Sequence, residues 1–113
     1  MLDEDRRALQ AVADDLFAGM NVLVVGRDSH ASRAHMDDMM CLYGKVLTCT
    51  PASVKVTASN QHIVRFVSLQ SNVDFLRGFY GVVHLMPSIK GNERDLPRWR
   101  ILQSSNERFR ING

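Results

Sequence analysis

The apolar run at residues 22–25, which reads Val-Leu-Val-Val, constrains the fold more than any other feature of this 113-residue chain. Asn21 precedes the run and Gly26 ends it, so no charged side chain interrupts it. A short β-branched run that ends in glycine is typical of a strand covered on both faces, as strands inside parallel sheets are. We therefore expect a central strand over 21–26.

Helical patterns lie on both sides of this strand. Residues 4–18 place apolar side chains at helical spacing, and Asp3 before them is a plausible N-cap. A second helix is expected to begin at Asp28 or Ser29 and to end at Gly44. Its buried face is expected to consist of Met36, Met39, Met40 and Tyr43.

The remaining extended segments complete an α/β domain. A strand over 45–49 follows the second helix, and this strand–helix–strand order implies a right-handed crossover. Residues 54–57 and 62–69 predict an antiparallel hairpin, and 81–85 predict a second buried strand. Further expected elements are a helical turn or loop at 75–78, a loop over 87–97, a strand at 99–103 and an extended end at 109–111. The prediction is one α/β domain over residues 1–113, with a small, mostly parallel sheet, flanking helices and an antiparallel hairpin.

Charge is distributed unevenly along the chain. Residues 1–38 hold eight acids and four bases, whereas the remainder holds four acids and ten bases. A basic side of this kind suits an anionic partner, although two differently solvated faces would give the same count. The chain lacks an apolar run of transmembrane length and its acidic start is unlike a signal peptide, so we expect no membrane partner. The expected location is the cytoplasm, or the host cytoplasm for a viral protein.

No segment supplies a complete catalytic or metal site. Cys41 and Cys49 lack a CxxC spacing and are expected to be free, buried thiols. His30 and His35 are five residues apart, which is not the spacing of a zinc-binding helix. His84 lies inside an apolar strand and is expected to be a hydrogen-bonded histidine in the core or at the end of the strand. We therefore predict a protein that is not an enzyme and that holds neither a metal nor a cofactor.

The turn over residues 26–33 is the candidate binding site. It follows a buried strand and opens a helix, which is where open α/β sheets bind ligands. The free amides and dipole at the start of a helix favour an anion. A well-capped helix start with solvent-exposed arginines and no ligand would give the same sequence pattern. The turn matches neither a dinucleotide-binding loop nor a Walker A loop. The candidate residues for binding nucleic acid or another anion are Arg27, Ser29, His30, Ser32, Arg33 and Arg77.

A second basic patch lies towards the end of the chain. Trp99 and Phe109 stand among its cations, an arrangement that suits single-stranded nucleic acid but that core strand ends would also produce. The patch consists of Lys90, Arg94, Arg98 and Arg100.

Taken in order, several segments resemble the middle of a helicase or phage large-terminase ATPase domain, which is RecA-like. Residues 21–33 resemble the strand, turn and helix start that follow Walker A in that family. Residues 63–68 (Ile-Val-Arg-Phe-Val-Ser) and 76–78 (Leu-Arg-Gly) resemble its hairpin strand and the segment after it. Residues 81–85 resemble the strand that leads to Walker B, and 99–105 resemble the last strand.

The sequence departs from this family at both catalytic motifs. No Walker A lysine is present, and Met86-Pro87 stand where Walker B has its acids. Without these groups, ATP hydrolysis lacks its phosphate and magnesium ligands. The resemblance therefore implies a degenerate RecA-like half domain that binds DNA or RNA, or a packaging or helicase-like assembly, through residues 27–32.

Two other interpretations remain open. One is a BRCT-like phosphopeptide-binding domain, because residues 17–26 and 43–46 resemble the opening of that fold, although Trp99 does not fit its last helix. The other is a protein-interaction module, such as a phage-encoded inhibitor of a host protein. A homo-oligomer is compatible with the methionines at 36, 39 and 40, which suit an adaptable interface as well as a core.

Overall fold

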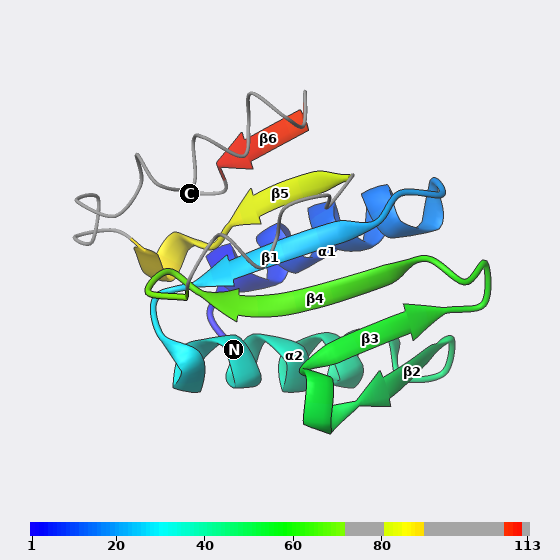
Figure 1. The fold of residues 1–113 in the computed structure, drawn as a ribbon, viewed down its shortest axis with the longest axis horizontal. Helices are drawn as coiled ribbons and strands as arrows, with labels where there is room; N and C mark the ends of the chain where they lie inside the picture. The colour runs from blue at the N-terminus through cyan, green and yellow to red at the C-terminus, as the bar shows by residue number, and fades with distance from the viewer. Residues whose placement is uncertain (72–80, 90–107, 112–113) are drawn as a thin grey trace.

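A computed structural model describes residues 1–71, 81–89 and 108–111 of the chain (Figure 1). Helix α1 (Asp3–Phe17) precedes strand β1 (Val22–Gly26), and helix α2 (Ser29–Tyr43) follows it. The later elements are β2 (Leu47–Thr50), η1 (Pro51–Ser53), β3 (Lys55–Ala58), β4 (Ile63–Ser68), β5 (Val82–Leu85), η3 (Pro87–Ile89) and β6 (Arg108–Ile111). The fold is α/β, as predicted. Neither of the helices described has the length and apolar character needed to cross a membrane.

The described strands form one mixed sheet in the order β2-β3-β4-β1-β5-β6. Strand β1 runs parallel to β4 and β5, and β5 runs parallel to β6. Strand β3 is antiparallel to both β2 and β4. The prediction of a mostly parallel sheet was therefore wrong, because the short connections between β2, β3 and β4 join antiparallel neighbours only.

The predicted crossover also ends in an unexpected place. Helix α2 carries the chain from β1 past two strand positions, so that β2 lies at the edge of the sheet and β3 and β4 fill the space between (Figure 1). The predicted hairpin is confirmed as β3 and β4, but it is part of a three-stranded meander that begins at β2.

Strand β1 lies at the centre of the sheet, as its sequence predicts. Val22 pairs with Val64 of β4 and with Val82 of β5, and every residue of β1 is buried. Val22 and Val24 face one apolar cluster, whereas Leu23 and Val25 face another. Because both faces are covered, the strand is apolar at every position and does not alternate.

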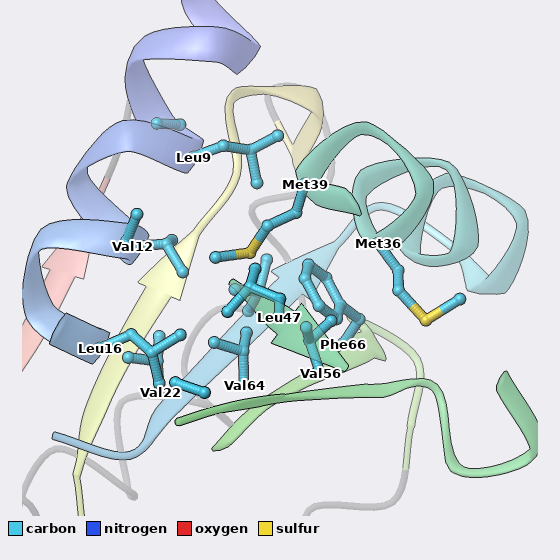
Figure 2. Packing of buried hydrophobic residues seen from close by; sticks show 14 of the residues in the cluster. Leu9, Val12, Leu16, Val22, Met36, Met39, Leu47, Val56, Val64 and Phe66 are labelled. Carbon is cyan, nitrogen blue, oxygen red and sulfur yellow. The ribbon is translucent and has the colours of Figure 1, made fainter. Parts of the chain in front are cut away.

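Both described helices lie on the same face of the sheet. Figure 2 shows Leu9, Val12 and Leu16 of α1 close to Met39 of α2, with strand side chains beneath them. Those strand side chains include Val22, Leu47, Val56, Val64 and Phe66. The opposite face carries a second cluster that consists of Leu23, Val25, Val67, Leu69, Val83, Leu85 and Ile89.

The helix starts show one correct and one wrong cap prediction. The Asp28 carboxylate accepts a hydrogen bond from the Ala31 amide at 2.7 Å, so Asp28 caps α2. Asp3, in contrast, is the first residue of α1, and Leu2 holds the N-cap position without a side-chain bond. The acidic first turn of α1 can still interact favourably with the positive end of the helix dipole.

A buried histidine–carboxylate pair connects α1 to β5. Nε2 of His84 lies 2.7 Å from an Asp15 carboxylate oxygen, across 69 residues of sequence. The His84 residue is 0% exposed and Asp15 is 8% exposed. His84 is therefore a partnered core residue, as predicted, and its partner is an acid on the helix that covers the sheet.

Candidate anion-binding turn at the carboxyl edge

The carboxyl ends of β1, β4 and β5 meet at one edge of the sheet, which we call the carboxyl edge. The Leu69 amide donates to the Gly26 carbonyl at 2.8 Å, and the Met86 amide donates to the Val25 carbonyl at 2.9 Å. The segments that follow these strands therefore begin side by side. Open α/β sheets bind ligands at this kind of edge.

Gly26 allows α2 to begin very close to the end of β1. A Cβ atom at Gly26 would lie 2.8 Å from Ser32 Oγ, 3.2 Å from the Ser32 amide nitrogen and 3.3 Å from Cδ2 of His35. Two of these atoms belong to side chains that are themselves buried. Gly26 is therefore required because α2 approaches the end of β1 so closely that a larger side chain would not fit.

Ser32 is part of this packing and not of the exposed turn. It was predicted to be an anion-binding donor, but it is only 3% exposed. Its hydroxyl donates to the Val67 carbonyl at 2.5 Å, which fastens α2 to β4. The hydroxyl proton is therefore already used inside the fold.

The exposed part of the turn retains four of the predicted residues. Their side chains reach solvent around the first turn of α2, and they are Arg27, Ser29, His30 and Arg33. We call these four residues the basic turn.

The capping carboxylate adds a negative charge to the basic turn. The hydrogen bond from the Ala31 amide holds the pKa of Asp28 below its ordinary value, and the nearby Arg27 and His30 act in the same direction. Arg27 Nε lies 3.3 Å from Asp28 Oδ2 in an exposed pair, which contributes little to stability. Asp28 therefore occupies the Ala31 amide and offsets part of the positive charge of the arginines.

His35 lies beneath the basic turn, and the sequence did not single it out as part of the site. Its Nε2 is 3.3 Å from the Ser88 hydroxyl in η3, and its Nδ1 is buried without a hydrogen-bond partner among the described residues. Burial lowers the pKa of His35, although the carboxylates of Asp5, Asp38 and Asp28 oppose this effect. The spacing of four residues from Met39, on the predicted buried face, was the available signal that His35 faces inward.

The lowered pKa of His35 predicts a pH-dependent stability. The folded protein binds a proton at His35 less readily than the unfolded chain, so the contribution of His35 is present above about pH 6.5 and is lost as the pH falls below it. Urea unfolding of His35→Gln at a series of pH values should show a smaller loss of stability on acidification than the unchanged protein. Ser29→Ala, an exposed substitution in the first turn of the same helix that removes no titratable group, is the control and should keep the original pH dependence.

Two serines make a further polar feature at the carboxyl edge. The Ser68 amide donates to the Ser71 hydroxyl at 3.3 Å, and the two hydroxyl oxygens are 3.1 Å apart. Ser68 pairs with Gly26 at the last position of β4, which places both serines near the basic turn. The sequence alone does not show that the two serines lie near the basic turn, because this depends on the parallel pairing of β1 with β4.

The other predicted site residues lie outside the described residues. They are Arg77 and the second basic patch of Lys90, Arg94, Arg98 and Arg100. At the end of β5 the described chain has Met86, which is buried, and then Pro87. Among the described side chains, no group of three His, Cys, Asp or Glu residues could hold a metal ion. Both cysteines are free thiols, but the prediction that they are buried was wrong, because Cys41 is exposed and Cys49 is half-buried.

Comparisons with known proteins give no relative for this chain: no family model matches it, and no curated protein or solved structure is significantly similar to it. The case for a function therefore depends on the residues at the carboxyl edge.

Proposed function

We propose that this chain is a non-catalytic module that contacts nucleic acid, or an assembly that processes nucleic acid, through the basic turn. The observation that carries the proposal is the exposure of Arg27, Ser29, His30 and Arg33 around the start of α2 at the carboxyl edge. Arginine forks bind phosphate oxygens in pairs, and free helix amides add uncharged donors. Within residues 26–33 the two arginines outnumber the single carboxylate of Asp28, which supports binding of an anion.

We also propose that the fold is a RecA-like half domain related to helicases or phage packaging ATPases. The order of the elements supports this relation, since a central strand, a helix, a hairpin and a second central strand follow one another as in that family. The Met86-Pro87 pair after β5, where that family has its Walker B acids, supports a role without ATP hydrolysis.

Arg27→Ala combined with Arg33→Ala tests the basic turn. Fluorescence anisotropy would follow binding of labelled single- and double-stranded DNA from low to physiological salt. If both arginines contact phosphates, the double variant should bind about tenfold or more weakly at low salt, and the slope of log affinity against log salt should fall by about 2. Its melting temperature should stay nearly unchanged, because both side chains are exposed.

Lys45→Ala combined with Lys55→Ala is the matched control, because these lysines lie just before β2 and in β3, on the far side of β4 from β1 and the basic turn. The control should bind DNA almost as well as the unchanged protein. Equal losses in both double variants would contradict a specific role for the basic turn, and no DNA binding at low salt would contradict nucleic-acid contact altogether. Binding of a phosphoserine peptide in place of DNA would favour the BRCT-like alternative.

A further inference from the structure

Strand β2 leaves one edge of the sheet open in the described part of the chain (Figure 1). The Ala58 amide donates to the His62 carbonyl, so Ala58 directs its backbone polar groups towards β4. Its partner in β2 is Leu47, which must then direct its own N–H and C=O away from β3. By the same alternation, Cys49 also directs its backbone groups outward. The edge thus presents a donor and an acceptor at each of two positions.

A hollow of about 600 Å³ lies beside this edge. Thr48 and Thr57 are cross-strand partners in its floor, and they point away from the helix-covered face to which Leu47 and Ala58 contribute. The side chains that line the hollow include Lys45, Val46, Thr48, Thr57, Ser59 and Gln61. A strand added to β2 would place alternate side chains over this hollow.

The charged side chains of the segment that forms β2 and β3 have one sign. Residues 44–62 contain two lysines, Lys45 and Lys55, and no aspartate or glutamate. Lys45 stands just before β2, and Lys55 pairs with Thr50 at the other end of the strand. A segment lying along β2 would therefore meet a cation near each of its ends, which complements acidic side chains.

The lining of the hollow favours a peptide over a nucleic acid. No aromatic side chain is among its lining residues, whereas single-stranded nucleic acids depend strongly on stacking against aromatic rings. The outward backbone groups of Leu47 and Cys49 fit the regular spacing of another peptide backbone. We propose that β2 is the docking edge for an extended acidic segment of a protein partner, which adds to the sheet as a further strand.

A short synthetic peptide of alternating glutamate and valine with blocked ends is the probe. The peptide is added to the isotope-labelled full chain, and amide shifts are followed by NMR while fluorescence polarisation gives the affinity. The largest amide shifts are expected at Leu47 and Cys49. A peptide with lysine in place of glutamate should bind about tenfold more weakly, because it meets Lys45 and Lys55 with like charge. Shifts centred elsewhere, or equal binding of both peptides, would overturn the proposal.

Two variants test the edge itself. Lys45→Glu combined with Lys55→Glu should weaken binding of the acidic peptide about tenfold, whereas Arg6→Glu combined with Arg7→Glu makes the same charge change on α1 and should not. Cys49→Pro removes an outward N–H without removing a hydrogen bond to β3. We expect this variant to melt cooperatively and to show no amide shifts when the acidic peptide is added. If Cys49→Pro does not fold, the lysine pair decides the outcome.

Competing occupants are separate outcomes that would overturn the proposal. An oligothymidine that shifts the same amides at lower concentration than the peptide would assign the edge to nucleic acid. Self-association of the free chain through β2, seen by sedimentation and lost in Cys49→Pro, would assign it to a second copy of the chain. The Arg27→Ala and Arg33→Ala variant should bind the peptide normally, so this proposal and the one for the basic turn fail independently.

Discussion

The Asp15→Ala variant is expected to lose about 3 kcal/mol of unfolding free energy. Its carboxylate lies 2.7 Å from Nε2 of His84, which is completely buried in β5. Removing the carboxylate takes away the contact with Nε2 of His84, whereas the desolvation cost of the buried imidazole remains. Urea unfolding followed by circular dichroism would measure the loss, and the midpoint should move to lower urea with little change in slope.

Asp14→Ala is a closely matched control, because it makes the same substitution one position earlier in α1. Asp14 is exposed, and its backbone carbonyl, which accepts a hydrogen bond from the Ala18 amide, is kept by the substitution. Asp14→Ala should change the unfolding free energy by less than about 0.5 kcal/mol. Similar losses in the two variants would show that the pair with His84 is not the cause.

The Gly26→Ala variant is expected to lose about 2 kcal/mol of unfolding free energy. The new Cβ would lie 2.8 Å from Ser32 Oγ, and the hydrogen bond to Val67 holds that hydroxyl in place. Relief requires α2 to move away from the end of β1, which would also displace the basic turn. Thermal and urea unfolding measure the stability, and the DNA titration described above measures the effect on the turn.

A double-mutant cycle identifies the contact responsible. Ser32→Ala alone should cost about 1 kcal/mol through the lost hydrogen bond. In the double variant Gly26→Ala with Ser32→Ala, the closest contact is absent. The double variant should therefore lose less unfolding free energy than the sum of the losses in the two single variants. Strict additivity would show that Ser32 Oγ does not cause the crowding at Gly26.

Local patterns in the sequence predicted the centre of the fold. The continuous apolar run at 22–25 is fixed by burial on both faces of β1, and Asp28 precedes α2 at the N-cap position. Both signals depend on residues that are close together in the chain. The same reasoning placed the β3–β4 hairpin, whose alternation follows from one covered and one open face.

The position of β2 could not be predicted in this way. Which strands become neighbours depends on contacts between distant residues, and the sequence of α2 contains no information about how far across the sheet its crossover extends. The inward orientation of Ser32, in contrast, was predictable: it precedes Met36 by four residues and Met39 by seven, which is the spacing of the buried face. Its serine side chain was instead interpreted as exposed because it is polar.

The pairing of Asp15 with His84 could not be predicted either, because the two residues are 69 positions apart. The sequence shows that His84 lies in a buried strand, but only the packing of α1 over β5 identifies its partner. The same limit applies to Ser88, which meets His35 at the carboxyl edge.

Because β1 pairs with β4 and β5, the centre of the sheet can be completed only late in synthesis on the ribosome. Strands β2, β3 and β4 pair with their neighbours in sequence and can form a meander soon after they emerge. Strand β1 emerges earlier, yet one of its edges stays bare until β5 is made. The most apolar segment of the chain therefore waits longest for its partners, and we expect chaperone binding to the nascent chain to centre on residues 22–25.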